Sequence, residues 1–309
     1  MIFTARGILV SLAFFAVVYT LLSLLLVVVW RGWRAFVPVK TESADVLFGL
    51  RVLPFGLSAA ITFFLTFPSF LLLENHSMDE DFCTFVLCLC SLLFVGAGLF
   101  SVVTAQRKTR RTVSEWMLRV SPEKASDAVV AAFGSRNALP IMLVGIRAPR
   151  VLVSERARVL LTQGELRVAV QHEMEHLRSH DNLKRAILNF IPFPGMASLE
   201  RAWQEAAELE ADLGAVSNRS EALDLASALV KLSRGLPLAV APALATGLFG
   251  AVESVAVRVE RLLEWENRQN VFDGWRYVIA AAFAALGVLA VNLGSALVVT
   301  HSLTERLVP

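Results

Sequence analysis

Charged residues are scarce in this chain. Only 18% of its 309 residues are Asp, Glu, Lys or Arg, whereas 56% are hydrophobic, and the mean hydropathy is +0.60. Such values are typical of integral membrane proteins. The formal net charge of +2 at pH 7 is also too small for the basic surface that neutralises nucleic-acid phosphates, so we expect no nucleic-acid partner.

Cysteine and tyrosine are rare as well. The three cysteines, Cys83, Cys88 and Cys90, lie within one apolar run, which argues against a disulfide framework or a thiolate metal cluster. We interpret them as small buried hydrophobic residues. Both tyrosines, Tyr19 and Tyr277, lie at or within apolar segments, so neither is available to a site in a soluble part of the chain.

Long uncharged runs are abundant. Four of them are long enough to cross about 30 Å of hydrocarbon: residues 8–30, 52–73, 82–105 and 277–300. The first run is longer than the apolar core of a signal peptide and is not followed by a small-residue cleavage site, so we expect it to remain as an anchor. The sequence therefore predicts four transmembrane helices.

The basic residues near these runs predict the orientation. Four of them lie around the first loop: Arg31, Arg34, Lys40 and Arg51. The loop at residues 74–81 has no Lys or Arg and carries four acidic residues. Because Lys and Arg concentrate in cytosolic loops, we expect the first loop inside and the second outside. The N terminus and residues 301–309 then lie outside.

A long segment separates the third and fourth runs. We predict a three-span membrane region at residues 1–105, a cytosolic domain at residues 106–275, and the fourth span with a short external tail at residues 276–309. The middle segment is long enough for one domain with its own core. Within it, residues 140–146 and 150–154 are predicted to form two short strands around a turn.

Two helices are predicted in the cytosolic domain. Thr162 and Glu165 have the spacing of a capping box, which opens a helix that we expect to continue to residue 180. A second helix, rich in Ala, Glu and Leu, is expected at residues 198–216. Residues 187–198 between them are apolar for a connecting loop, and would either dip into the bilayer interface or lie buried within the domain.

Two histidines on the first of these helices indicate a metal site. His172 and His176 are four residues apart, so they project from one face and can reach the same ion. Glu173 would point to the open side of the metal, where a carboxylate can take a proton from water. His180 lies about 12 Å from His172 along the helix axis and cannot share that ion. The pattern supplies two ligands and a catalytic base.

The second helix offers the third protein ligand that a catalytic zinc needs. Glu208 and Asp212 are four residues apart and share a face. We predict that Glu208 binds the metal and that Asp212 accepts a hydrogen bond from a zinc-binding histidine. Glu205 and Glu210 remain alternatives, although Glu210 points nearly opposite to Glu208. The expected cofactor is one catalytic Zn²⁺.

The pairing of HExxH at residues 172–176 with ExxxD at residues 208–212 resembles the gluzincin metallopeptidases. It is most similar to membrane metallopeptidases of the BlaR/MecR type, which act as antibiotic sensors, and residues 145–154 and 258–263 contribute to this similarity. The resemblance covers about residues 140–265. It implies a mainly α protein of the bacterial cytoplasmic membrane, with four transmembrane helices, an external N terminus and a cytosolic α+β gluzincin-like zinc protease domain between the third and fourth spans.

The resemblance also implies a function. The chain would be a membrane-anchored zinc endopeptidase in signalling or regulated proteolysis, and its partners would be the lipid bilayer and a repressor or sensor protein. The substrate would be a cytosolic or membrane-near protein, including the chain itself. Antibiotic receptors carry an extracellular penicillin-binding sensor after the last span, whereas only residues 301–309 follow here, so β-lactam sensing by this chain alone is not expected.

Two other functions remain open. Membrane proteases of the HtpX and CAAX-processing types share both motifs and act in protein quality control or processing. A catalytically idle receptor or scaffold with a structural zinc is the second alternative. For a peptidase, we expect the substrate to add as a β-strand along an edge near residues 141–146, although an ordinary core strand is equally compatible with this apolar stretch.

Overall fold

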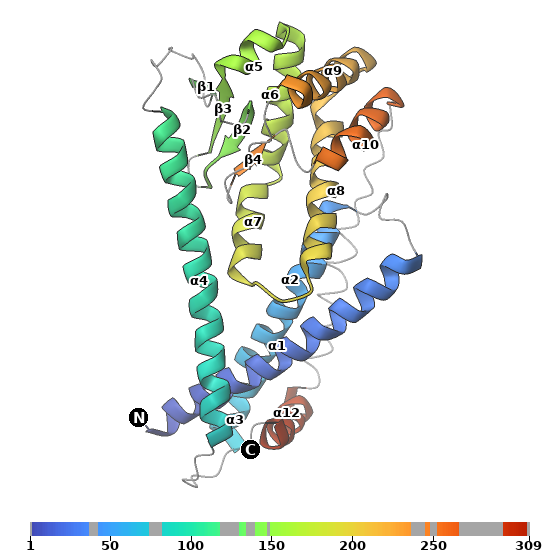
Figure 1. The fold of residues 1–309 in the computed structure, drawn as a ribbon. Coiled ribbons are helices and arrows are strands. Elements are labelled where there is room, and N and C mark those ends of the chain that lie inside the picture. Colours follow the sequence, from blue (N-terminus) through green and yellow to red (C-terminus); the bar gives the residue numbers. More distant parts are fainter. Residues whose placement is uncertain are drawn as a thin grey trace.

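The computed structural model describes residues 2–36, 43–73, 82–117, 130–133, 140–146, 149–235, 245–247, 252–265 and 293–307. This part of the chain is mostly helical and includes one small sheet. Long helices gather at one end of the molecule, and the sheet with several shorter helices occupies the other (Figure 1).

Three helical rods are long and apolar enough to cross a membrane: Arg6–Arg34, Ala44–Leu73 and Phe85–Arg111. They belong to α1 (Ile2–Phe36), to the succession of α2 (Ala44–Ile61), η1 (Thr62–Thr66) and α3 (Phe67–Leu73), and to α4 (Phe82–Met117). The first three predicted runs therefore form helices of sufficient length. The predicted fourth span falls mostly outside the described residues, and α12 (Leu293–Leu307) includes only its last part.

The boundary of the second rod differs from the prediction. Arg51 was expected in the loop before the span, but α2 begins at Ala44 and carries Arg51 within it, where the side chain is buried. The rod also contains Pro54 and Pro68 without breaking, because η1 is a π-helical turn that lies just ahead of Pro68. A buried arginine is thus part of an otherwise apolar helix.

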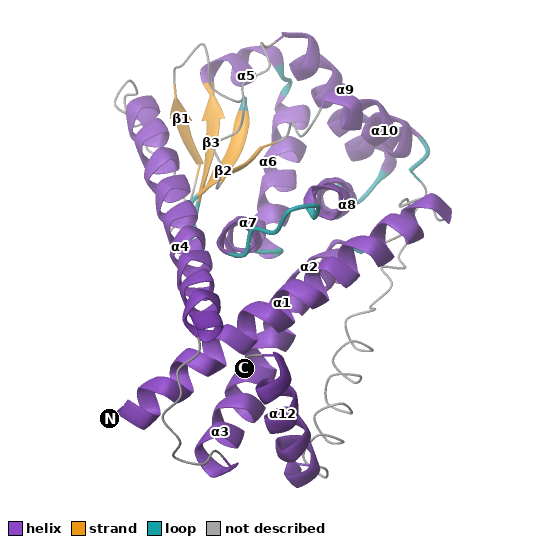
Figure 2. Ribbon diagram, turned by 60° about the horizontal axis from the view of Figure 1, so that its bottom comes forward, coloured by secondary structure: helices purple, strands orange, loops and turns teal. Residues whose placement is uncertain are grey.

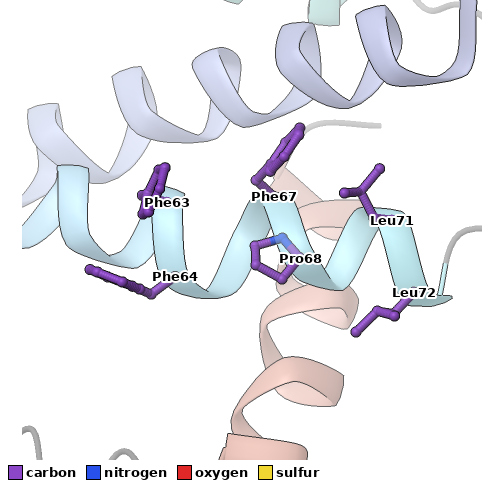
Figure 3. A pocket seen from close by; sticks show the side chains of 6 residues that line it. All are labelled: Phe63, Phe64, Phe67, Pro68, Leu71 and Leu72. Atoms are coloured by element: carbon purple, nitrogen blue, oxygen red, sulfur yellow. The ribbon is translucent and has the colours of Figure 1, made fainter. Parts of the chain in front are cut away.

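The outer surfaces of the rods are apolar. Phe100 and Leu72, for example, are 70% and 71% exposed, as expected for side chains that contact lipid tails. One face of the second rod forms a shallow apolar groove (Figure 3), lined by Phe63, Phe64, Phe67, Pro68, Leu71 and Leu72. These surfaces indicate a membrane-associated protein.

Of the two cysteines whose side chains the structure describes, one fits the interpretation as a buried hydrophobic residue. Cys88 is buried, but Cys90 is exposed on the outer face of α4, so the interpretation is wrong for that residue. The side chain of Cys83 lies outside the described part. Because α4 is apolar on all sides, its sequence does not distinguish an inward from an outward position.

The sheet has the strand order β1-β3-β2-β4. Its strands are β1 (Val130–Phe133), β2 (Ile141–Val144), β3 (Arg150–Ser154) and β4 (Ala245–Gly247). The predicted pair of strands is confirmed, since β2 and β3 are antiparallel neighbours. Of the two interpretations of residues 141–146, the core strand is confirmed and the edge strand is wrong, because β2 also pairs with β4 on its other side. All four side chains of β2 are buried, as in a strand covered on both faces.

Six helices complete this part of the molecule: α5 (Glu155–Leu160), α6 (Gln163–Arg178), α7 (Asp181–Phe190), α8 (Ala197–Ala215), α9 (Arg219–Gly235) and α10 (Val252–Leu263). The predicted capping box is present at the start of α6, where Thr162 and Glu165 bond each other's backbone N–H groups. The expected end at residue 180 is two residues too late. His180 has a φ of 57°, which ends the helical path and opens α7.

The apolar stretch at residues 187–198 is not buried within the domain alone, and its contact with the bilayer interface stays a prediction. Its first part is the end of α7, and the remaining loop packs against the membrane rods, with the Phe193 ring 5.6 Å from that of Tyr19 in α1. Gly195 has a φ of +88° and lies against Val27 of α1. A second close approach occurs at Gly98 of α4, where an added methyl group would overlap with the backbone of Phe190 in α7.

Candidate metal centre

The two predicted histidine ligands lie together on the inner face of α6. His172 and His176 are 0% and 1% exposed. Their Nε2 atoms are 3.1 Å apart, and their rings are nearly perpendicular. This arrangement follows from the four-residue spacing, which places both side chains on one face of α6.

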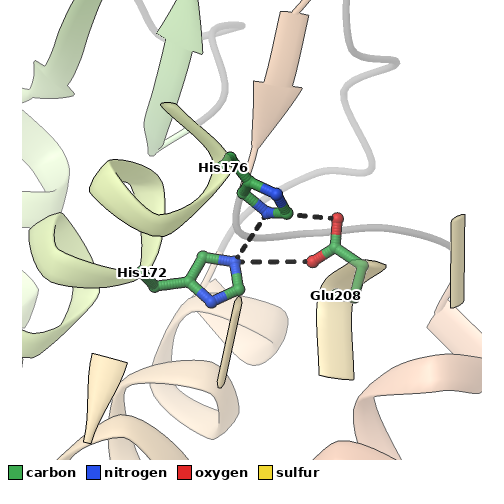
Figure 4. A group of neighbouring side chains, drawn as sticks. All are labelled: His172, His176 and Glu208. Atoms are coloured by element: carbon green, nitrogen blue, oxygen red, sulfur yellow. Dashed lines mark hydrogen bonds and ion pairs between the residues drawn. The ribbon is translucent and has the colours of Figure 1, made fainter. Parts of the chain in front are cut away.

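Glu208 reaches the same point from α8 (Figure 4). Its Oε2 is 3.5 Å from Nε2 of His172, and its Oε1 is 3.6 Å from Nε2 of His176. Donor atoms that bind one zinc ion tetrahedrally, each about 2.0–2.1 Å from it, are separated from one another by about 3.3 Å. The three buried side chains therefore have a spacing at which they can hold one metal ion.

The alternative carboxylates lie elsewhere. Glu205 is exposed on the outer face of α8. Glu210 turns away from the histidines, and its Oε1 accepts a hydrogen bond of 2.9 Å from the backbone N–H of Ala44. Of the acidic residues considered on α8, only Glu208 joins the histidine pair.

Each histidine has a carboxylate on its other ring nitrogen. Nδ1 of His172 is 3.0 Å from Oδ1 of Asp212, as the sequence predicts. Nδ1 of His176 is 2.6 Å from Oδ2 of Asp181, a contact that the sequence reading missed. Carboxylates at Nδ1 leave both Nε2 atoms available to a metal and fix the orientation of both rings. The sequence did contain a signal for the contact between His176 and Asp181, because Asp181 is the first acidic residue after the helix that carries HExxH.

Arg258 of α10 is the second residue that the sequence reading missed. Its side chain is 1% exposed, and its Nε and Nη2 donate to the two oxygens of Asp212 at 2.7 and 2.6 Å. Its Nη1 lies 2.9 Å from Oε2 of Glu208. One guanidinium group thus contacts both Glu208, the predicted ligand, and Asp212, the carboxylate that contacts His172. Arg258 belongs to the segment at residues 258–263 that carries part of the resemblance, but the spacing alone gave it no role.

The predicted base, Glu173, is fully buried beside the histidines. Its Oε2 accepts a hydrogen bond of 3.0 Å from the N–H of Leu143 in β2. Its Oε1 has no hydrogen-bond partner among the described residues. An unpaired carboxylate oxygen in a buried position is costly, unless a further group such as water or a cation contacts it.

Asn182 connects α7 to the same strand. Its Nδ2 donates to the carbonyl oxygens of Leu143 and Gly145, at 3.3 and 3.0 Å. The N–H of Leu143 is therefore hydrogen-bonded to Glu173 of α6, and its carbonyl group to Asn182 of α7. The strand, α6 and α7 meet at this point, which fixes Glu173 relative to His172 and His176.

The charges at the centre determine where protons lie. Burial lowers the pKa of His172, but its hydrogen bonds with Asp212 and Glu208 raise it above the ordinary value. Burial likewise opposes the charge on His176, yet the neighbouring Glu208 and Asp181 raise its pKa to about 10. Because a metal ion binds the unprotonated nitrogen, a divalent ion at these Nε2 atoms would compete with protons for the two rings.

The carboxylates are affected in opposite directions. Burial raises the pKa of Glu173 above its ordinary value, which suits a group that accepts and returns a proton. Burial also acts on Glu208, but Arg258 and His176 hold its pKa well below the usual range. Asp212 is kept ionised mainly by Arg258 and His172. One carboxylate can thus work as a base while another remains an anionic ligand.

Comparison with known proteins gives no family model and no curated protein that matches the chain. What can be said of the site therefore comes from its geometry alone. A buried His, His and Glu group can hold a metal ion, and a further buried glutamate lies beside it.

Proposed function

We propose that the chain is a membrane-anchored zinc-dependent endopeptidase. The observation that carries the proposal is the convergence of His172, His176 and Glu208 on one point, with Glu173 buried beside them. Two imidazoles and one carboxylate are a ligand set of catalytic zinc sites, which keep their fourth position open. The resemblance to BlaR/MecR-type membrane metallopeptidases supports the same assignment.

The chain's own residues fit zinc at this place. His172, His176 and Glu208 would hold the ion, while Asp212 and Asp181 orient the two rings and Arg258 orients the carboxylate. When bound, zinc supplies a Lewis acid that polarises a carbonyl group and acidifies water. The ligand set carries neutral nitrogen donors and one anion, as this chemistry requires.

Glu173 would move the proton. Its Oε1 is free of hydrogen bonds within the described part, whereas its Oε2 is held by Leu143 N–H. Oε1 is therefore the atom that takes a proton from the attacking water and later gives it to the leaving amine. The raised pKa of Glu173 supports both steps, because burial makes its protonated form more accessible than that of an exposed glutamate.

The position of the centre supports substrates close to the membrane. The loop between α7 and α8 packs on α1, and α2 packs along α8, the helix that carries Glu208 (Figures 1 and 2). The start of α2 lies on the side of the zinc helices, as the bond from Ala44 to Glu210 requires. With basic residues on that side, the domain is proposed to lie in the cytosol of a bacterium and the N terminus outside.

A segment of the chain itself is the first substrate to test. The backbone of β4 pairs with Met142 to Val144 of β2, the strand that Glu173 contacts. A peptide that adds to β2 as a strand would have to take the place of β4. Cleavage of the chain near residues 245–247 is therefore the simplest form of the proposed activity, and a repressor or sensor protein is the next candidate.

The decisive comparison is between the full-length protein and its Glu173→Gln variant in detergent or lipid discs. We expect both to bind one zinc per chain, and only the wild type to cleave the chain or co-expressed membrane-near proteins. Zinc content is measured by elemental analysis and cleavage by mass spectrometry of new termini. Equal cleavage products in both, or equal cellular phenotypes with no cleavage in either, would instead identify a zinc-holding scaffold.

A further inference from the structure

The membrane helix α2 runs alongside α8, the helix that carries Glu208 (Figure 1). The contact has an apolar centre, in which Leu47 of α2 and Trp203, Ala206 and Ala207 of α8 belong to one buried cluster. Polar anchors lie on both sides of this centre. The two helices are antiparallel, because the start of α2 meets the later part of α8.

The first anchor is Arg51, whose side chain is 1% exposed. Its Nε donates to Oε1 of Glu200 in the first turn of α8 at 2.8 Å. Its Nη2 donates to the carbonyl oxygen of Ile191 at the end of α7 at 2.6 Å. One membrane-helix side chain thus holds both ends of the loop between α7 and α8.

The second anchor is the backbone N–H of Ala44, which donates to Oε1 of Glu210 at 2.9 Å. Glu200 and Glu210 lie on opposite sides of Glu208 along α8. Glu208 is about 12 Å from Glu200 along the axis and about 3 Å from Glu210, at a rise of about 1.5 Å per residue. The two anchors together determine how far α8 is displaced along α2 and how it is rotated.

The other ligands do not share this attachment. His172 and His176 are on α6, which packs against α8, α9 and the strands. A displacement of α8 along α2 therefore moves Glu208 relative to the histidine pair. The oxygen atoms of Glu208 lie 3.5 and 3.6 Å from the two Nε2 atoms, so a shift of a fraction of an ångström changes the coordination that the site can offer.

We propose that Arg51 is a positioning residue for Glu208, and that membrane helix α2 thereby sets the metal affinity of the centre. This role rests on the proposed function, because Glu208 must be a metal ligand for it, but it does not require that the chain be a peptidase. Loss of Arg51 would leave Glu200 and the Ile191 carbonyl without their partner and release one end of α8. Loss of the Glu210 anchor would release α8 at the other end.

The test is zinc affinity of the full chain in lipid discs, measured by competition with a chromophoric chelator. We expect Arg51→Met to weaken zinc binding about 10-fold or more, as do changes to groups that orient metal ligands, and Arg51→Lys to recover part of the loss. Glu210→Ala should weaken binding less. The matched control is Arg167→Met, which breaks an exposed ion pair of 2.5 Å between α6 and Glu221 and should leave the affinity unchanged.

A double-mutant cycle separates positioning from general loosening. In a Glu208→Ala background, Arg51→Met should cause no further loss of zinc affinity, because the residue through which it acts is gone. Additive losses in the double variant, or an affinity in Arg51→Met equal to that of the wild type, would overturn the proposal. A cobalt-substituted protein gives a second readout, since its visible spectrum should change in Arg51→Met and not in Arg167→Met.

The results also distinguish this inference from the proposed function. A wild type that binds zinc but cleaves nothing refutes the peptidase, while the affinities of the variants still decide the role of Arg51. A wild type that binds no zinc refutes both.

Discussion

The metal centre and the membrane rods are held together by different forces. At the centre, the contacts are between buried charged groups: the carboxylates of Glu208 and Asp212 meet one guanidinium, and both histidines meet carboxylates. Among the rods, aromatic and aliphatic packing dominates, as between Tyr19 and Phe55 or Phe94. A buried charge is costly when its partner is lost. An apolar contact in a bilayer, in contrast, can be replaced by a contact with lipid tails. The centre should therefore tolerate far less change than the rods.

The largest effect is expected from Arg258→Met. The change removes the common partner of two buried carboxylates, and breaking a buried ion pair in this way costs about 3–5 kcal/mol. We expect a strongly lowered melting temperature in the protein treated with a chelator. Zinc should restore part of the loss, because the ion supplies positive charge next to Glu208. If the melting temperature were the same as in the wild type, the buried charges would not hold the centre together.

A smaller effect is expected from Asp181→Asn. The change keeps the size of the side chain but removes the anion that orients His176 and increases its basicity. Loss of such a carboxylate weakens metal binding about 10–100-fold. Asp212→Asn is the matched variant at His172, and the two should weaken zinc affinity to a similar extent in chelator competition. An effect at Asp212 alone would show that the contact at Asp181 has no part in metal binding.

A pH-dependent effect is expected away from the metal, at Glu165. Burial opposes the charge of this carboxylate, but hydrogen bonds from Lys231, Ser227 and Thr162 lower its pKa. Its folded pKa is below the unfolded value, so its stabilising contribution is present above about pH 4.3 and is lost as the pH falls through the folded pKa. The melting temperature of Glu165→Gln should be lower than that of the wild type at pH 7, and the difference should shrink on acidification. A difference that stays constant with pH would contradict this role.

The smallest effect is expected on the lipid-facing surface. Leu72 is 71% exposed in the apolar groove of the second rod. Because lipid tails replace the contacts of the missing atoms, Leu72→Ala should change the melting temperature in lipid discs by less than the equivalent of about 0.5 kcal/mol. Zinc affinity should be unchanged. A large loss would indicate that this groove is filled by protein and is not in contact with lipid.

The sequence predicts those features that depend on local spacing. His172, His176, Glu208 and Asp212 follow from four-residue repeats on two helices, and the capping box marks the start of α6. The three helices that are long enough to cross a membrane follow from uncharged length. In each of these cases the information lies within one segment of the chain, so no knowledge of the tertiary structure is required.

The sequence does not predict features that join distant segments. Arg258 contacts Asp212, which is 46 positions away in the sequence, and Arg51 contacts Glu200, which is 149 positions away. The choice between an edge and a core position for β2 stayed open for the same reason, because its partner β4 is about a hundred residues further along the chain. Asp181 is close in sequence but follows the left-handed turn at His180, whose geometry the helical pattern does not contain.

The contact between Gly98 and Phe190 has a practical consequence for anyone who wishes to study the part with the candidate metal centre by itself. Here the backbone of a membrane helix touches the end of α7, and the neighbouring loop carries Phe193 onto α1. An excised fragment that begins after α4 would expose this apolar surface to water and would lack Arg51 as well. Such a fragment should be poorly soluble, so work on the isolated protein requires a detergent or a bilayer mimic.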